Sequence, residues 1–449
     1  DPSSPAVGAG VDGATLGDSR WFPPAPPKVI QVEAGTDQIA AALAGANAGD
    51  TIELVTPGGV YVESATTVID KPLTIRAADG LLAYPIWTTD NDKRLLTLAS
   101  DLSLDGIVFD GSLGAGPTED CIRLAEGVFN QNLRVNDCVF QYFDDGLGEG
   151  HAIKASSDDG MDSLIVTNSL FQHMMHEHIS LKDENENIPP GPCKYLWVEN
   201  CTFWDGENEA IYLQSHDNVP DGTPDPFAYI SHVTVVSMAS KGLYLNQIDG
   251  AVIENSIVIN SSSYEYACRI YGTNSSVDGL LYWNCPEGIS LKEGAEESQL
   301  TLIQAEVDPM MADVENGDFT LDPSSPAVGA GVDGATLGDP RWFPGATGVD
   351  RDEAAVVDAF QLNQNYPNPF NPSTTITYAL PAQSNVKIKI YSLIGKEIAS
   401  LVNKQQNSGQ YSVIWDGRDS NGDFVSSGIY LYKISADNFS DVRRMVYLK

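Results

Sequence analysis

The chain has 449 residues, and its 62 Asp+Glu against 25 Lys+Arg give a formal net charge of -37. This acidity excludes a nucleic-acid-binding protein that relies on neutralising phosphates. No run reaches the ~20 apolar residues of a membrane-spanning helix. The charge is uneven, because residues 356–449 carry 9 Lys+Arg and 7 Asp+Glu whereas residues 1–355 carry 16 and 55. We therefore expect two domains with different surfaces.

A nearly literal repeat frames the first region. Residues 1–23 and 322–344 agree at 22 of 23 positions and differ only at Ser19 and Pro340. The second copy closes a domain, so residues 1–27 are expected to be the tail of a preceding tandem domain followed by a Pro-rich linker. Because the chain has neither an initiator Met nor a signal peptide, we expect a processed or excised segment.

Residues 36–47 predict an amphipathic helix with Thr36 as its N-cap and with Ile39 and Leu43 on its apolar face. It precedes the first strand-like run, residues 50–54. Open strand edges template aggregation, so a helix at this place is typical of a cap on a stack of strands.

Short runs of alternating apolar residues recur between residues 50 and 321, and the first inward residues of successive runs lie 31, 26, 32, 32, 25 and 21 positions apart. Two or three short strands every ~20–32 residues predict an all-β fold, a parallel β-helix over residues 28–344. A β-sandwich would lack one polar turn in phase with the repeat. The inward residues are Ile122, Ile153, Ile179, Ile211, Leu243, Cys268 and Ile289, and the expected turn residues are Asp137, Asn168, Asn200, His232, Asn255 and Asn284.

Several segments resemble pectate-lyase-like right-handed β-helix proteins, and more closely the branch with chondroitinase-B-like and alginate-lyase-like enzymes. The resemblance lies in residues 34–54, 71–77, 166–171 and 198–203, and extends to the closing segment before residue 344. It implies a right-handed β-helix with an N-terminal capping helix. The related lyases pair a Lys with an Arg one rung on, near calcium held by Asn and Glu. The rung after Lys182 offers Tyr212 and Gln214 instead of Arg.

The C-terminal region has short alternating strands broken by Pro, Gly and Asn, which predict a small Ig-like β-sandwich over residues 359–449 after a linker at 345–358. Its motifs, from Asn365 through Gly409 to Arg443 and the final Lys449, occur in an order that closely resembles the type A C-terminal sorting domain of the type IX secretion system. This resemblance implies export to the extracellular space or the outer-membrane surface of a Gram-negative, Bacteroidetes-like bacterium, with the secretion machinery as a partner.

The six cysteines favour buried thiols. Cys138, Cys201 and Cys285 each follow a predicted turn residue, a phase that Ser169 and Ser256 share. Disulfides between Cys121 and Cys138, or between Cys268 and Cys285, stay open as alternatives.

In the β-helix, residues between the inward positions should face outward. They form two columns rich in Lys, Arg and Tyr, with almost no carboxylate, in a region of strongly negative net charge. Cations attract uronate or sulfate groups and Tyr rings stack on sugars, so an acidic polysaccharide is the expected partner. The first column is Arg123, Lys154, Ser180, Tyr212, Tyr244, Arg269 and Ser290, and the second is Lys182, Gln214, Asn246, Tyr271 and Lys292.

The chemistry that suits such a polymer is β-elimination, which needs a base, an acid and a cation on the uronate. Lys182 and Lys154 are candidates for base and carboxylate neutraliser, and Tyr212 or Tyr244 for the acid. Arg269 is a candidate substrate clamp, while His178 and His216 are reserves. Arg123 and the other second-column residues, Gln214, Asn246, Tyr271 and Lys292, are candidate substrate contacts.

No metal site is predicted, because His173, His176 and His178 around Glu177 lack the helical spacing of a zinc motif. Calcium at Glu207, Glu209 and Asp217 stays open.

The rival hypothesis is a non-catalytic surface repeat protein, an adhesin or a fibre subunit. The near-identical repeat favours it, since long arrays are built from such copies and stacked β-helix ends propagate head to tail.

Overall fold

The computed structural model describes residues 27–343 and 360–447, apart from gaps at 92–93, 115–117, 145, 147–148, 156–159, 183–192, 216–225, 249, 262–265, 273, 293–299, 363–364, 366–373, 381–383, 393–395, 407–408, 416, 421–423, 427 and 437–438. The chain forms two compact units, 1–349 and 350–449. The first copy of the repeat, the predicted linker at 345–358 and parts of the C-terminal motifs lie outside the described residues.

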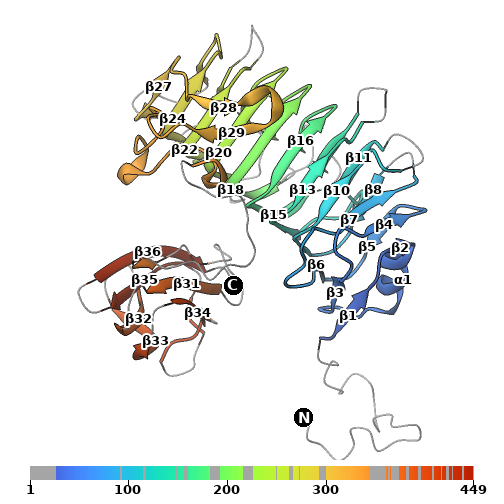
Figure 1. Ribbon diagram of the computed structural model, residues 1–449, viewed down its shortest axis with the longest axis horizontal. Helices are drawn as coiled ribbons and strands as arrows, with labels where there is room; N and C mark the ends of the chain where they lie inside the picture. Colours follow the sequence, from blue (N-terminus) through green and yellow to red (C-terminus); the bar gives the residue numbers. More distant parts are fainter. Residues whose placement is uncertain are drawn as a thin grey trace, which may run out of the picture. The chain divides into compact units, whose positions relative to one another are not determined.

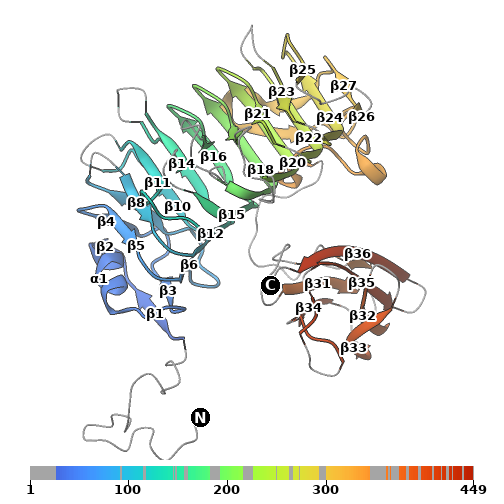
Figure 2. The same cartoon turned by 180° about the vertical axis from the view of Figure 1, so that it is seen from behind.

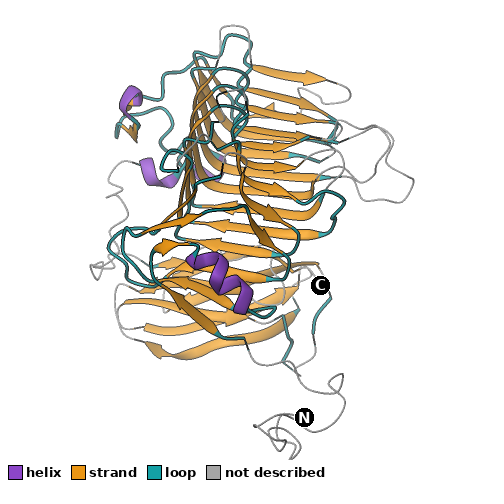
Figure 3. Cartoon of the chain, turned by 90° about the vertical axis from the view of Figure 1, so that its right-hand side faces the viewer, coloured by secondary structure: helices purple, strands orange, loops and turns teal. Residues whose placement is uncertain are grey.

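The first unit is a parallel β-helix, as predicted (Figure 1). Two of its faces share one 18-stranded sheet. In the early rungs, each of these two faces has its own strand. In the later rungs, one long strand passes through both faces. Figure 3 shows the strands stacked as rungs. The first face contains β1 (Val29–Val32), β3 (Thr51–Leu54), β6 (Leu73–Ala77), β9 (Leu102–Asp105), β12 (Gln131–Asn136) and β15 (Met161–Thr167); the second contains β2 (Gly35–Thr36), β4 (Val60–Glu63), β7 (Ile86–Thr89), β10 (Val108–Asp110), β13 (Val139–Gln141) and β16 (Leu170–Met174); the long and final strands are β18 (Cys193–Gly206), β20 (Phe227–Met238), β22 (Val252–Ile259), β24 (Ser276–Trp283), β26 (Leu300–Thr301) and β27 (Gln304–Ala305).

The third face is a nine-stranded parallel sheet that carries the predicted columns. Its strands follow chain order from one end to the other, and Figure 2 labels several of them. They are β5 (Thr67–Ile69), β8 (Arg94–Leu98), β11 (Asp120–Leu124), β14 (His151–Ala155), β17 (Ile179–Leu181), β19 (Ile211–Gln214), β21 (Leu243–Asn246), β23 (Cys268–Tyr271) and β25 (Ile289–Lys292).

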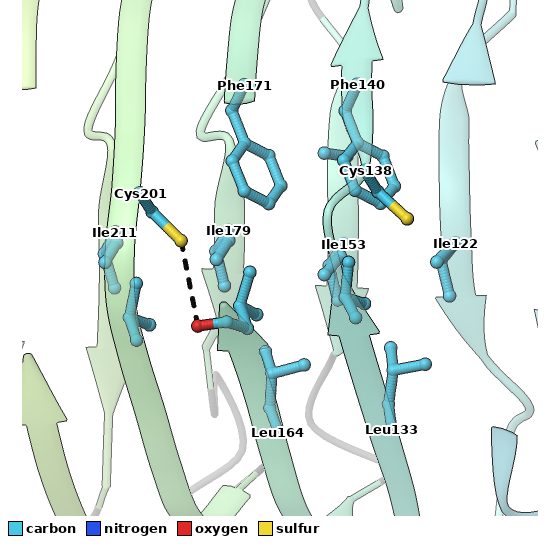
Figure 4. Packing of buried hydrophobic residues seen from close by; sticks show 14 of the residues in the cluster. Ile122, Leu133, Cys138, Phe140, Ile153, Leu164, Phe171, Ile179, Cys201 and Ile211 are labelled. Atoms are coloured by element: carbon cyan, nitrogen blue, oxygen red, sulfur yellow. Dashed lines mark hydrogen bonds between the residues drawn. The ribbon is translucent and has the colours of Figure 1, made fainter. Parts of the chain in front are cut away.

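The core between the faces is built from like side chains stacked rung upon rung. Phe140 lies between Phe109 and Phe171, with ring centroids 4.7 and 4.8 Å apart. Each such stack contributes about 0.5–1.5 kcal/mol beyond the burial of its surface. Figure 4 shows this stacking for Phe140 and Phe171 and for the inward isoleucines.

All six cysteines are buried and unbonded to one another, which confirms the expectation of core thiols. Burial raises the pKa of Cys201 to about 12, so its thiol keeps its proton. Its Sγ donates to the carbonyl oxygen of Val166 at 3.7 Å (Figure 4).

The predicted polar turn forms a column of residues in the left-handed conformation. Asp137, Asn168, Asn200, His232 and Asn255 all have φ between 50° and 55°. Asn200 donates through Nδ2 to Asn168 Oδ1 at 3.2 Å, which links successive rungs.

Asn284 does not belong to this column. The register between β22 and β24 places Gly279 beside Asn255. Asn284 instead donates to Asn260 at 2.9 Å in a second column of turns, so Cys285 shares its phase with Ser261 and not with Cys201.

The capping helix α1 spans Gln38–Gly45 and buries Ile39 and Leu43. Thr36 is not its N-cap, because it lies in β2 and the helix begins after Asp37, whose side chain makes no capping bond. The backbone amides of Ile39 and Ala40 donate instead to Glu63 at 3.1 and 3.3 Å. A carboxylate from the next rung therefore satisfies the free amides of the helix start.

The closing repeat segment packs over the outer side of the 18-stranded sheet. A second apolar cluster forms there, in which Leu337 and Phe319 meet Ile257 of β22. Asp339 accepts a hydrogen bond from Thr202 at 2.8 Å, and Arg341 pairs with Asp339 and donates to the carbonyl oxygen of Ser169 at 2.7 Å. The elements of this region are β28 (Met311–Asp313), η4 (Val314–Asn316), β29 (Asp318–Leu321), η5 (Val332–Gly334) and η6 (Pro340–Trp342).

The second unit is a small all-β domain with its own core, in which Trp415, Tyr432 and Ile388 are buried. Its strands pair antiparallel in a three-stranded and a four-stranded sheet. Across the described part of the whole chain, no helix has the length and apolar character needed to cross a membrane. The strands are β30 (Gln361–Leu362), β31 (Thr374–Leu380) and β34 (Gly409–Trp415), then β32 (Ser384–Ser392), β33 (Glu397–Gln406), β35 (Gly428–Ala436) and β36 (Phe439–Tyr447).

Candidate functional site

The outer side of the nine-stranded sheet carries the two predicted columns. In the first column, each residue lies beside the next one on the neighbouring strand. In order, these residues are Arg123, Lys154, Ser180, Tyr212, Tyr244, Arg269 and Ser290. In the second column Gln214 lies beside Asn246 and Tyr271 beside Lys292, while Lys182 follows the end of β17. His216 lies outside the described residues. The register of both columns is therefore as predicted.

A departure from strict alternation near the start of several strands adds a third column that alternation does not predict. Two consecutive residues, such as Ala152 and Ile153, both point into the core. Their amides both donate to the carbonyl oxygen of His178 at 3.1 Å, as at a β-bulge. The residue before each pair then lies on the outer side of the sheet, where neighbouring side chains bury most of it. These residues are Asp120, His151, Glu177, Glu209 and Lys241.

The expectation of a face almost free of carboxylates is therefore wrong. Arg123 pairs with Asp120 and Glu119, Lys154 with Glu149, and Lys182 with Glu177. Strict alternation from Arg123 skips Asp120, because the two residues between them, Cys121 and Ile122, are both buried in the core. Cations on this face are consequently neutralised in part by their own neighbours.

The rungs of β11, β14 and β17 form what we call the charged half of the face. A pocket of about 530 Å³ opens there. The side chains of Lys154 and Lys182 are 16% and 22% exposed, so they are held but still reachable. The pocket is lined by Arg123, Glu149, His151, Lys154, Ala155, His176, Ser180 and Lys182.

His151 lies at the bottom of this pocket between two buried carboxylates. Its Nδ1 is 2.8 Å from Asp120 Oδ1 and its Nε2 is 3.0 Å from Glu177 Oε2. Burial alone would lower the pKa of His151, but hydrogen bonds to both carboxylates raise it overall. Burial would likewise raise the pKa values of Asp120 and Glu177, yet hydrogen bonds from His151 and nearby cations lower both. The group forms one charged network.

The rungs of β19, β21 and β23 form the tyrosine half. The rings of Tyr212 and Tyr244 stack with centroids 4.5 Å apart, and the guanidinium of Arg269 lies 5.6 Å from Tyr244 and 5.0 Å from Tyr271. Burial, followed by the neighbouring Tyr244, raises the pKa of Tyr212, so its phenol stays protonated. The ammonium of Lys182 lies 4.7 Å over Tyr212 and joins the two halves.

His178 is not a surface residue, so its role as a reserve substrate contact is wrong. It occupies the extra inward position and is fully buried, with Phe171 and Phe203 as ring neighbours. Burial lowers its pKa to about 3. The three neighbouring histidines His173, His176 and His178 lie in different places, and of these three His176 contacts Glu177.

His173 lies at a different pocket of about 490 Å³, where its Nδ1 is 2.7 Å from Asp205. Glu207, one of the open calcium ligands, lines the same pocket. Glu209 instead accepts hydrogen bonds from Lys241 at 2.9 Å and from Ser240 at 3.1 Å. Asp217 lies outside the described residues. Among the residues that the structure describes, Glu207 and Glu209 do not belong to a common group of possible metal ligands.

Comparisons with known proteins give limited support. Residues 370–440 match the FlgD Ig-like domain family, so an Ig-like domain is present in the second unit. No curated protein matches the chain. Among solved structures, the PL6 family alginate lyase AlyGC is 19% identical with a TM-score of 0.49 over 66% of this chain, and a mutant of the same lyase is 17% identical with a TM-score of 0.42 over the same share.

Both alignments span 42% of the lyase, less than half of its length. PorZ, a surface component of the type IX secretion system of Porphyromonas gingivalis, is 21% identical over 27% of this chain and 14% of its own, with a TM-score of 0.15. These values are too low to transfer a function to this chain.

Proposed function

We propose that the chain is a secreted or cell-surface β-helix protein that binds an acidic polysaccharide along the outer side of its nine-stranded sheet. Uronate or sulfate groups pair with Arg123, Lys154 and Lys182, and sugar rings stack on the tyrosine half. Because the strands repeat at about 4.8 Å, an extended polymer crossing them meets similar groups at regular intervals.

The observation that carries this proposal is the contrast between the face and the rest of the chain. A protein of net charge -37 places three partly exposed cations around one pocket. Stacked tyrosines continue from it in register over the next two rungs. The carboxylates beside the cations set their positions, so the pocket presents fixed donors and not mobile chains.

The test is titration with alginate, polygalacturonate and chondroitin sulfate, with dextran as the neutral control. We expect binding of at least one acidic polymer, weakened by salt. The double variant Lys154→Met/Lys182→Met should lose tenfold or more, since each charge-assisted hydrogen bond contributes about 1.5–3 kcal/mol.

The matched control is Lys194→Met, which removes a Lys on β18 that pairs with Asp162. It should bind like the unaltered chain. Absence of binding to every acidic polymer, or an equal loss in the control, would refute the proposal.

A second candidate function, β-elimination at the same pocket, is favoured by the contact between Lys182 and Tyr212 on adjacent rungs. Lys182 would take the proton α to the uronate carboxylate, which Lys154 neutralises. The electron pair forms the double bond, and Tyr212 or Tyr244 protonates the leaving oxygen. A lysine is a base only when neutral, so the rate should rise with pH. Absorbance of the unsaturated product measures it, and bound polymer that stays intact excludes it.

Export is proposed on the C-terminal motifs together with the Ig-like domain. Residues 350–449 fused to a periplasmic reporter should reach the medium or cell surface in a bacterium with a type IX system, and not in a strain that lacks the system. Reporter retained in the periplasm of both strains would contradict it.

The repeat of 22 in 23 residues favours a further candidate function, a head-to-tail array of such domains. Filaments in electron micrographs of the secreted protein would support it. Dispersed monomers at high concentration would argue against it.

A further inference from the structure

Two histidines and a glutamate meet at the bottom of the charged half. We propose that His151, His176 and Glu177 form a binding site for a divalent transition-metal ion. Their ligand atoms all lie within 4.8 Å of one another. Glu177 Oε2 is the shared point, because it contacts both His151 Nε2 and His176 Nδ1. One ion placed among the three atoms would replace these contacts with bonds.

The surroundings fix the imidazole of His151 in the orientation that a ligand needs. Asp120 Oδ1 is 2.8 Å from His151 Nδ1, and both side chains are almost fully buried. A carboxylate on one ring nitrogen directs the other toward a metal and raises its basicity. Asp120 is therefore a positioning residue.

The charges around the site leave room for a cation. Four carboxylates, on Glu119, Asp120, Glu149 and Glu177, face the three cations Arg123, Lys154 and Lys182. Metal binding requires neutral imidazoles, and with these the four carboxylates and three cations carry one negative charge in excess. A bound divalent ion would reverse this excess, so the loaded pocket would present net positive charge to an anionic group. Lys182 contacts Oε1 of Glu177, which leaves Oε2 for the ion.

The ligand types select the class of metal. Two imidazoles with one carboxylate is the donor set of zinc and of non-haem iron sites, with the remaining positions open to water or substrate. Calcium takes six to eight oxygens and is a poor match. The open positions here face the pocket, because His176 is 26% exposed whereas His151 and Glu177 lie beneath it. An anionic group entering the pocket would therefore reach the ion.

The test uses the full chain, stripped with a chelator and titrated calorimetrically with Zn²⁺, with Co²⁺ absorption as a report on coordination. We expect one equivalent to bind and to raise the unfolding temperature. His176→Ala should weaken binding by at least tenfold. Asp120→Asn should weaken it by 10–100-fold and, as a positioning change, leave one equivalent and the Co²⁺ band pattern recognisable.

The matched control is His173→Ala, which removes a histidine of similar exposure that also contacts a carboxylate, Asp205, at the other pocket. It should leave the affinity unchanged. His176 is partly exposed, so its variant is expected to fold, and circular dichroism checks this.

Failure of the unaltered chain to bind Zn²⁺ or Co²⁺ stoichiometrically would overturn the proposal, as would an equal loss in the two histidine variants. Because the titration contains no polymer, its result is independent of whether the face binds polysaccharide.

Discussion

The charged half and the tyrosine half share one sheet and one register, and in both halves two consecutive residues near the strand start are buried, yet the halves stabilise their side chains differently. In the charged half, Glu177 contacts His151, His176 and Lys182. In the tyrosine half, the equivalent Glu209 has Lys241 as its cation, and ring stacking holds Tyr212 and Tyr244. The backbone therefore sets only the spacing between side chains. The third-column residue of a rung determines whether that rung presents charged or aromatic side chains.

The largest effect that separates the halves is expected from Glu177→Gln. In this variant, His151, His176 and Lys182 contact a buried neutral amide in place of a carboxylate. The loss should lower the free energy of unfolding by about 3–5 kcal/mol. Chemical denaturation measures the loss. Glu209→Gln is the matched control one rung away and should cost about 1–2 kcal/mol. Similar losses in both variants would show that the two halves do not differ in this way.

The pH dependence of stability should also come from the charged half. Asp120 and Glu177 have pKa values below their ordinary 3.8 and 4.5, so their stabilisation is present above those values and is lost as pH falls. His151 has a pKa above 6.5, so its contribution is complete below 6.5 and is lost as pH rises through its raised pKa. His178 opposes it, since its lowered pKa removes stability as pH falls from 6.5 toward 3.

We therefore expect the β-helix to lose stability toward pH 3, with Glu177 alone accounting for about 2 kcal/mol of the loss. Denaturation curves over this range measure it. The acid loss should be smaller in Glu177→Gln, and an unchanged acid loss in that variant would contradict the assignment.

The two halves should differ in how polymer binding responds to salt. Lys154→Met should weaken binding about tenfold and flatten its salt dependence, because it removes a charge from the pocket. Tyr244→Leu should weaken binding about fivefold, since a stacked ring contributes about 1 kcal/mol, and should keep the salt dependence. Calorimetry at low and high salt distinguishes them. A common salt response would remove the distinction.

The smallest effect is expected from Tyr212→Phe. It keeps the ring stack and removes only the hydroxyl that donates to Gln214 at 2.9 Å. Polymer affinity should change less than about twofold, because the hydrogen bond that is lost joins two residues of the protein and the ring that stacks on the sugar is kept. If the face performs β-elimination with Tyr212 as the acid, the rate should fall much more than the affinity. A large loss of affinity would show that the hydroxyl, and not the ring, contacts the polymer.

The sequence predicted the register of this face because the signal repeats. An Ile or Leu at each inward position fixes which side of each strand is buried, so Arg123, Lys154 and Tyr212 followed from spacing alone. The capping helix was predicted from its apolar face, but its N-cap was not, since Glu63 reaches it from the next rung. A contact between two rungs cannot be predicted from the sequence of one segment, because its two partners are far apart in the chain.

The third column escaped prediction for a related reason. The extra inward position is filled by small residues such as Ala152, Ala210 and Ala267, which suit either side of a strand and so give no periodic signal. His178 is the one large residue among these examples. Because it is polar, we expected it at the surface, but the fold buries it in the core. Asn284 was likewise assigned to the wrong column, because the last rungs are shorter.

By itself the sequence determined an acidic chain with a repeated segment, a coil of short strands with an inward apolar column, and a separate C-terminal β domain. Only the tertiary structure decided that Asp120, His151, His176 and Glu177 meet in one network. Successive coils stack 26 to 32 residues apart in sequence here, and two consecutive buried residues in a strand set which side chain lies on the outer side of the sheet. Which charges become neighbours is a property of that stacking, not of any one segment.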